Sequence, residues 1–137
     1  MHTFHYKYDK QYYKLLPKPK ACSASKNYLH NMITDKNAIF LVVEEKKLLI
    51  GCLLAHVENR PPVLPPQKHI ILDHVVVSEQ YQGNGVFSKL QRKLDKIAVE
   101  RGASYIELIV DALNPVVKIY EKKGYSTNHL KMVKNIK

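Results

Sequence analysis

The residues with the clearest chemical meaning lie in one short stretch, YQGNGVFSKL, residues 81–90. Two of the five glycines of the chain, Gly83 and Gly85, stand here directly before a predicted helix. The first amides of a helix have no partner inside the helix, and the helix dipole makes that end electropositive. Such an end binds phosphate, and glycines let the phosphate approach the backbone closely. The stretch therefore predicts an anion site, to which Lys89 and Arg92 would add positive charge.

The loop matches neither of two common nucleotide-binding signatures. The chain has no GxxxxGK[ST] stretch, and the dinucleotide pattern GxGxxG lacks its final glycine here. Taken alone, the loop is also explained by a tight strand-to-helix turn that binds nothing. Other sequence features have to decide between these two interpretations.

Two titratable side chains stand on a predicted strand just before this loop, HIILDHVVV, residues 69–77. The carboxylate of Asp73 is costly to bury in an apolar strand without a partner or a function. His74 is an alternative proton acceptor, because the ordinary histidine pKa of about 6.5 suits a base. Strand alternation sends the two side chains to opposite faces unless a bulge intervenes. We favour Asp73 over His74, with Glu107 third, while a structural aspartate bonded to a backbone group or a lysine is equally consistent.

Strand and turn signals place these residues in a regular order of elements. Residues 38–57, AIFLVVEEKKLLIGCLLAHV, predict an antiparallel hairpin with a charged turn at residues 45–47. The proline-rich residues 58–68 predict a loop, and residues 105–110 predict a strand that follows the strand at 69–77. The two later strands and the helix between them form one crossover, so these strands are expected to be parallel neighbours.

Helix signals follow the same order. Apolar residues recur at helical spacing from Phe87 to Ala98, and Gly102 is well placed to end that helix. Asn114 and Pro115 predict the start of another helix, which Gly124 would stop.

The two ends of the chain give weaker signals. Residues 2–8 predict an edge strand, and residues 10–16 predict a short helix that ends before two prolines. A second helix is expected to begin at Ser23 or Ser25, and residues 126–136 predict a weak final strand. The chain is thus expected to form a single domain over residues 1–137, of the α/β or α+β class with a mixed sheet.

Composition limits the classes of function. No apolar run is long enough to span a membrane and no signal-peptide core is present, which favours a cytoplasmic protein. Cys22 and Cys52 cannot form a disulfide framework. The net charge of +10 attracts anions without identifying them. His2, His5, His30, His56, His69 and His129 show no metal-ligand spacing and are interpreted as ordinary surface or core residues.

Two blocks of the sequence resemble the GNAT N-acetyltransferase superfamily. VVVSEQYQGNGVFSKL resembles motif A of that family, with Gln82 and Gly85 at its glutamine and glycine positions. NPVVKIYEKKGY resembles the later family signature, which Tyr120, Glu121, Lys122, Gly124 and Tyr125 match. Phe87 departs from the usual glycine or alanine, and Asn114 lies one residue closer to the tyrosine than usual. The resemblance covers residues 37–125 and implies a mainly antiparallel sheet with a splayed central strand, flanked by helices.

The resemblance implies a site for acetyl-CoA. The loop would hold the pyrophosphate through main-chain amides, and the strand before it would hydrogen-bond the pantetheine arm. The implied cofactor-binding residues are Val75, Val76, Val77, Gln82, Gly83, Asn84, Gly85, Val86, Phe87, Ser88, Asn114 and Tyr120. One amide among Val75, Val76 and Val77 would polarise the thioester carbonyl.

The implied reaction is direct attack of a primary amine on the acetyl thioester. Tyr120 would act as the acid that protonates the leaving thiolate, since an ordinary tyrosine pKa of about 10 keeps it protonated. The alternative for Tyr120 is a packing role alone. Asp73 or His74 would take the proton of the amine.

Two other functions stay open beside the N-acetyltransferase. One is a module of the same fold that binds acyl-CoA without catalysis, and the other is a basic nucleic-acid-binding protein, which is disfavoured because no dense basic run is present. A small metabolite amine or amino acid is the preferred acceptor, and a peptide N-terminus or lysine is the second choice. A homodimer agrees with the family.

Overall fold

The computed structural model of the protein describes residues 18–136, with side chains from residue 26 onward. The described elements are α2 (Lys18–Thr34), β1 (Ala38–Glu45), β2 (Leu48–Asn59), β3 (Lys68–Val77), the 3₁₀ turn η1 (Glu79–Tyr81), α3 (Val86–Glu100), β4 (Ile106–Glu107) and α4 (Val117–Lys122). The strands form one sheet in the order β1-β2-β3-β4. The pairs β1–β2 and β2–β3 are antiparallel and β3–β4 is parallel. The predicted mixed, mainly antiparallel sheet is confirmed.

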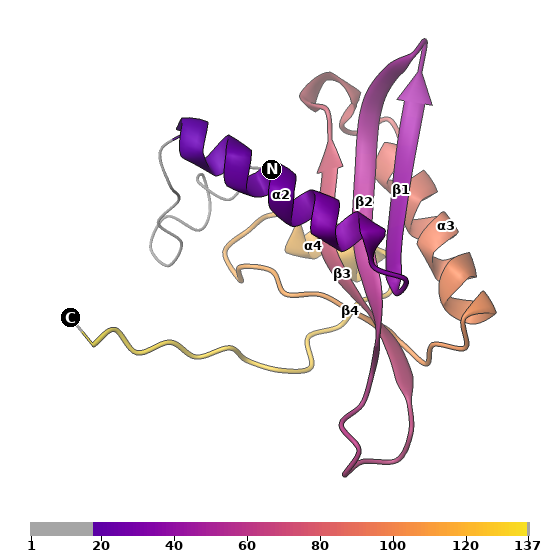
Figure 1. Ribbon diagram of the computed structural model, residues 1–137, viewed down its shortest axis with the longest axis vertical. Coiled ribbons are helices and arrows are strands. Elements are labelled where there is room, and N and C mark those ends of the chain that lie inside the picture. The colour runs from indigo at the N-terminus through magenta and orange to yellow at the C-terminus, as the bar shows by residue number, and fades with distance from the viewer. Residues whose placement is uncertain (1–17, 137) are drawn as a thin grey trace.

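The helices cover both faces of the sheet. Helix α2 crosses one face, while α3 and α4 lie on the opposite side (Figure 1). Within the described residues, no helix has the length and apolar character needed to cross a membrane.

The main core lies between the sheet and α3. Leu53 and Ala55 of β2 and Ile70 of β3 are fully buried against this helix. The apolar stripe of α3 supplies the other side of the core through Leu90, which is 2% exposed, and Leu94, which is 0% exposed. The helical spacing read from the sequence therefore identified the buried face of α3 correctly.

The hairpin of β1 and β2 has the predicted charged turn. Lys46 and Lys47 connect the strands, with φ angles of 49° and 65°. Two positive φ angles in a two-residue connection are typical of a type I′ turn, which matches the twist of paired strands. The turn is built here from lysines, although glycine and asparagine adopt this conformation more easily.

Three sequence predictions about element boundaries are wrong. Helix α2 begins at Lys18, so Ser23 and Ser25 lie inside it and do not cap it. The strand predicted at residues 105–110 is limited to Ile106–Glu107, because β3 and β4 pair over only two residues each. Residues 126–136 form neither helix nor strand. The predictions for residues 2–8 and 10–16 lie outside the described residues.

Candidate functional site

The loop before α3, residues 82–85, is called the glycine loop, and its glycines have the backbone conformation that glycine favours. Gly83 and Gly85 have φ angles of 79° and 80°, and Gly85 immediately precedes α3. A Cβ atom added to either glycine would have no other atom within 4 Å. Both positions therefore need glycine for the left-handed conformation, and the space in front of the loop is open.

The amides at the start of α3 have no acceptor among residues 18–136. Lys89 donates its amide to the carbonyl of Gly85 at 3.0 Å, which is the first helical bond. Five amides before Lys89, in the loop and in the first turn of α3, donate to no carbonyl or side chain of residues 18–136. These are the amides of Gly83, Gly85, Val86, Phe87 and Ser88. These amides are the donors that the predicted anion site would use.

The remaining loop residues use their amides inside the turn. Gln82 donates its amide to the carbonyl of Glu79 at 3.2 Å, and Asn84 donates to the carbonyl of Tyr81 at 3.4 Å. The side-chain Nε2 of Gln82 donates to the carbonyl of Val77 at 3.1 Å. Gln82 therefore shapes the loop and links it to the end of β3.

A cation that the sequence analysis did not single out lies beside the loop. Lys123, directly after α4, donates from Nζ to Oγ of Ser88 at 2.6 Å. Ser88 lies in the first turn of α3, so this contact brings the ammonium group to the electropositive end of that helix. The only sequence signal was its place in the Tyr120–Tyr125 block, where Lys123 occupies the variable position.

Strand β3 leaves β4 after a short contact. Ile70 pairs with Ile106 and Ile71 pairs with Glu107, and no later pair joins the two strands. The part of β3 from Leu72 to Val77 therefore has β2 as its one sheet neighbour among the described residues. This is the splayed arrangement that was predicted for the central strand.

The register of β2 and β3 shows which main-chain groups of β3 face away from β2. Ser78 donates to the carbonyl of Ile50 at 2.9 Å, which continues the register in which Val76 lies opposite Cys52. Because hydrogen-bonded pairs alternate in an antiparallel ladder, Val76 also directs its amide to β2. Val75 and Val77 direct theirs to the opposite side, and their side chains pack on the core.

Tyr120 belongs to a cluster of three aromatic rings. Its ring makes edge contacts with Phe87, at a centroid distance of 5.6 Å, and with Tyr125, at 5.5 Å. Burial raises the pKa of the Tyr120 hydroxyl above its ordinary value of 10.0. Phe87 thus packs against the predicted acid at the end of α3 that carries the loop.

Tyr125 has a fixed hydrogen-bond partner. Its hydroxyl lies 3.2 Å from Oε1 of Gln91, and Nε2 of this buried glutamine donates to Asp95 at 2.8 Å. Burial is the main cause that raises the pKa of Tyr125 to about 12. These contacts fix the C-terminal end of the signature block on α3.

Asn114 is buried and caps the turn that leads into α4. Its Oδ1 accepts a hydrogen bond from the amide of Val116 at 3.0 Å, and its side chain and backbone together are 6% exposed. The helix start predicted at Asn114 and Pro115 is two residues too early, because the α-helix begins at Val117 with Val116 at its N-cap, and Asn114 caps the turn before it. Since Oδ1 serves this cap, the amide nitrogen is the group left for the predicted cofactor contact.

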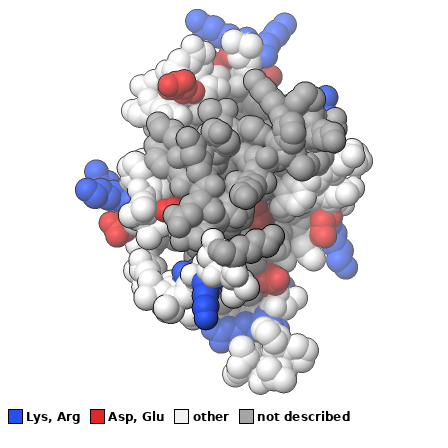
Figure 2. Space-filling model, turned by 90° about the vertical axis from the view of Figure 1, so that its left-hand side faces the viewer, with Lys and Arg blue, Asp and Glu red and all other residues white. Residues whose placement is uncertain are grey.

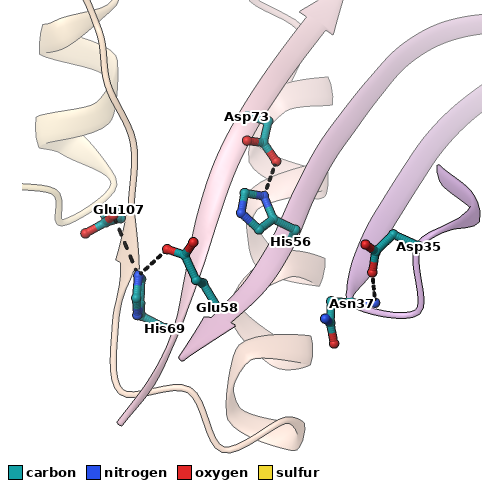
Figure 3. Close-up of polar contacts among 7 residues, drawn as sticks. All are labelled: Asp35, Asn37, His56, Glu58, His69, Asp73 and Glu107. Atoms are coloured by element: carbon teal, nitrogen blue, oxygen red, sulfur yellow. Dashed lines mark hydrogen bonds and ion pairs between the residues drawn. The ribbon is translucent and has the colours of Figure 1, made fainter. Parts of the chain in front are cut away.

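The titratable candidates on β3 lie at a bulge. Ala55 pairs with Leu72 and Leu54 pairs with His74, so Asp73 is an extra residue in β3. Asp73 contacts His56 of β2, with 2.7 Å between Oδ2 and Nδ1 (Figure 3). The sequence alone predicts an ordinary surface or core role for His56, because its pairing with Asp73 depends on the register of two strands.

Glu107 belongs to a different polar cluster. One of its carboxylate oxygens lies 3.8 Å from Nε2 of His69, which is also 3.3 Å from Glu58 (Figure 3). Glu107 is therefore engaged with His69 and is separate from the Asp73–His56 pair. No group of His, Cys, Asp and Glu among residues 18–136 is arranged to hold a metal ion.

The described charged residues do not form one patch on the face shown in Figure 2. The described Lys and Arg side chains are scattered around the edge of this face, with Asp and Glu between them. This distribution gives no support to an extended nucleic-acid groove on the part of the face that the structure describes.

Comparison with protein families gives one match over most of the chain. Residues 4–125 match the model described as the acetyltransferase (GNAT) family. A search of curated proteins gave no match.

Solved structures show the same fold. The chain superposes on a tetramutant of the BH1408 protein from Bacillus halodurans with a TM-score of 0.86 and 17% identity, covering 98% of this chain and 86% of that one. A putative acetyl transferase from Pyrococcus furiosus superposes with a TM-score of 0.77 and 24% identity, covering 98% of this chain and 90% of that one. Ribosomal-protein-alanine N-acetyltransferase from Brucella melitensis biovar Abortus 2308 superposes with a TM-score of 0.64 and 21% identity, covering 80% of this chain and 79% of that one.

Proposed function

The chain belongs to the acetyltransferase (GNAT) family, and from this premise we propose that it is an N-acetyltransferase that moves the acetyl group of acetyl-CoA to a primary amine. The observation that carries the proposal is the glycine loop before α3. The amides of Gly83, Gly85 and the first turn of α3 have no acceptor within the described chain, and the space in front of the two glycines is open. Both properties suit a pyrophosphate that approaches the backbone closely.

Three further features support binding of the cofactor. The separation of β3 from β4 leaves one edge of β3 without a ladder partner among the described residues, as a pantetheine arm would require. Val75 and Val77 direct main-chain groups to this edge and are proposed to bond the arm. Lys123 and Ser88 add a cation and a hydroxyl at the helix end. The amide of Val76 faces β2, so Val75 is the better candidate to polarise the thioester carbonyl.

The chemistry requires little from the protein beyond positioning and proton transfer. Acetyl-CoA supplies an activated acetyl group, and the neutral amine attacks its carbonyl carbon directly. The leaving thiolate needs a proton, which Tyr120 is proposed to donate. Because burial raises the pKa of Tyr120, its hydroxyl stays protonated through neutral pH. Phe87 would keep that ring in place through their edge contact.

The acceptor is proposed to be a small metabolite amine or amino acid. A peptide N-terminus is the second candidate, and the fold shared with an enzyme named for acetylating ribosomal-protein alanine is consistent with it. The excess of 22 Lys and Arg over 12 Asp and Glu disfavours a polycationic acceptor, which usually needs acidic walls. The cytoplasmic location and the homodimer stay predictions from the sequence.

Calorimetric titration of acetyl-CoA into the full chain at about physiological salt tests the proposal. Free CoA and a short DNA duplex are the controls. Binding of acetyl-CoA with one-to-one stoichiometry, followed by thiol release on addition of an amine, is the expected result. Binding without thiol release from any amine of a broad panel would indicate a non-catalytic acyl-CoA module. Binding of DNA alone would overturn the proposal and make the net charge the functional feature.

A further inference from the structure

The pair formed by His56 and Asp73 lies between the two central strands. Its Nδ1–Oδ2 distance is 2.7 Å, with the side chain of Asp73 15% exposed and that of His56 31% exposed (Figure 3). A carboxylate can only accept a hydrogen bond, so Nδ1 carries the proton in this contact. The other ring nitrogen, Nε2, then holds a free lone pair, and no described residue hydrogen-bonds to it.

The bulge determines on which face this pair lies. Leu72 belongs to the core under α3, and Val75 is the next residue of β3 that packs on that core. The two residues between them, Asp73 and His74, therefore both lie on the other face, toward α2. The contact of the His74 ring with Tyr28 of α2, at a centroid distance of 6.0 Å, agrees with this placement.

The negative charge of Asp73 acts on Tyr28, which lies on the same face of the sheet. Burial is the main cause that raises the pKa of Tyr28, and the negative charge of Asp73 adds to it. The described titratable groups on this side of the sheet near His56 include Asp73, His74 and His69 of β3, Tyr28 of α2, Cys52 and Glu58 of β2, and Glu107 of β4. The β1 residue opposite His56 is Ala38, which carries no charge.

We propose that His56 is the base of the transfer reaction and that Asp73 is a positioning residue that acts through it. The inference rests on the proposed N-acetyltransferase function. Nε2 of His56 would take a proton from the amine as the new N–C bond forms. The C–S bond breaks, the thiolate takes a proton from Tyr120, and the imidazolium passes its proton through solvent to restore that tyrosine.

His56 suits this role better than the two residues chosen from the sequence. A carboxylate is a weaker acceptor for an amine proton than an imidazole nitrogen. The carboxylate of Asp73 faces the imidazole and fixes which ring nitrogen is protonated. The ring of His74 is held against Tyr28.

The first experiment measures thiol release from acetyl-CoA with a panel of a small primary monoamine, lysine methyl ester and an alanine-started peptide. His56→Ala should lower kcat about 100-fold or more, and the KM for acetyl-CoA should change less than about twofold. Added imidazole should restore part of the lost rate, which a purely structural role would not allow. In His56→Gln, the acidic limb of the pH–rate profile should disappear.

His69→Gln is the matched control, because it also breaks a contact between a histidine and a carboxylate on β2 and β3. It should lower thermal stability while leaving kcat within about twofold. Asp73→Asn should lower kcat and allow both imidazole tautomers of His56, which nitrogen chemical shifts distinguish. If every His56 variant turns over at the wild-type rate, the role of His56 is wrong and the proposed function stands. If the wild type acetylates no amine, both fail.

Discussion

A Cβ atom placed on Gly51 of β2 would lie 2.8 Å from Cγ1 of Val86, the first residue of α3. Val86 is 5% exposed and belongs to the core. The missing side chain at Gly51 therefore lets the start of α3 approach the sheet closely. Since Gly83 and Gly85 precede Val86, this contact also sets the distance of the glycine loop from β2.

Gly51→Ala is expected to destabilise the protein and weaken cofactor binding together. Overfilling a packed core costs about 1–3 kcal/mol, and here the strain falls on the helix end that carries the loop. Urea unfolding measures the first effect and calorimetric titration with acetyl-CoA measures the second.

Val86→Ala supplies the control for this contact. It removes the methyl group that clashes, so Gly51→Ala should cost less in the Val86→Ala background than in the wild type. A double-mutant cycle gives this coupling directly. Additive losses in the cycle would mean that the Gly51–Val86 contact does not set the position of α3.

Gly85→Ala should weaken acetyl-CoA binding more than its effect on stability explains. Alanine in the left-handed conformation costs about 1–2 kcal/mol, and its methyl group would stand in the open space before the loop. Gly102→Ala is the matched variant, since Gly102 also has a positive φ, 71°, with open space around its Cβ position, but lies after α3. Equal losses of affinity in the two variants would argue against a phosphate site at Gly85.

Lys123→Met is expected to weaken acetyl-CoA binding about 3- to 10-fold, because it removes an ammonium group from the end of α3. The loss should shrink as the salt concentration rises, since salt screens exposed charges. Lys122→Met removes a neighbouring cation that has no contact with Ser88 and should change affinity less. Calorimetry at two salt concentrations separates these results, and an equal effect of both variants would contradict the assignment of Lys123.

Tyr120→Phe should lower kcat while leaving the fold and the affinity for acetyl-CoA nearly unchanged. The ring can keep its contacts with Phe87 and Tyr125, so the hydroxyl is the only group lost. A general acid contributes about 100-fold or more to a rate. Tyr105→Phe is the control, because that ring stacks on His69, within a different cluster. Wild-type kcat in Tyr120→Phe would leave Tyr120 a packing role only.

Stability should fall at alkaline pH partly through Tyr125. Its pKa is raised from 10.0 to about 12, mainly by burial, so the unfolded chain loses this proton first. The contribution of Tyr125 is complete below pH 10 and is lost as the pH rises toward 12. Tyr125→Phe should therefore lower the urea midpoint near neutral pH. Between pH 10 and about pH 12 the midpoint of this variant should fall less steeply than that of the wild type. Parallel pH curves for both proteins would exclude Tyr125 as the cause.

Much of the fold follows from local patterns in the chain. The hairpin from β1 to β2 was predicted from two apolar runs around a charged turn, and the structure has this turn at Lys46 and Lys47. Helix α3 was predicted from the spacing of residues such as Leu90 and Leu94, which are buried as expected. These features depend on neighbours in sequence, which a pattern can show.

Features that depend on distant partners were not predictable in the same way. Residues 105–110 have the composition of a strand, but only Ile106–Glu107 pair, because β3 diverges from β4 at that point. Residues 126–136 alternate weakly and form no strand. A strand needs a partner edge, and composition does not reveal where that edge lies.

In the candidate site, too, the features formed by neighbouring residues were predictable and those formed by distant residues were not. The glycine loop lies in one continuous segment, so its position before α3 could be predicted. The pairs Lys123–Ser88 and His56–Asp73 join residues 35 and 17 positions apart, and each depends on how elements meet in space. Whether the loop binds a cofactor, and which residue takes a proton, stay predictions for the experiments above.

The bulge in β3 makes Asp73 the residue that the core could most easily lose. With Asp73 deleted, Leu72 would be followed directly by His74, the pairs with Ala55 and Leu54 would become consecutive, and Val75 would still face α3. A shorter chain would thus give a more regular ladder with the same buried side chains. What the extra residue adds is the 2.7 Å contact with His56, so the bulge serves to place a carboxylate against that imidazole rather than to build the core.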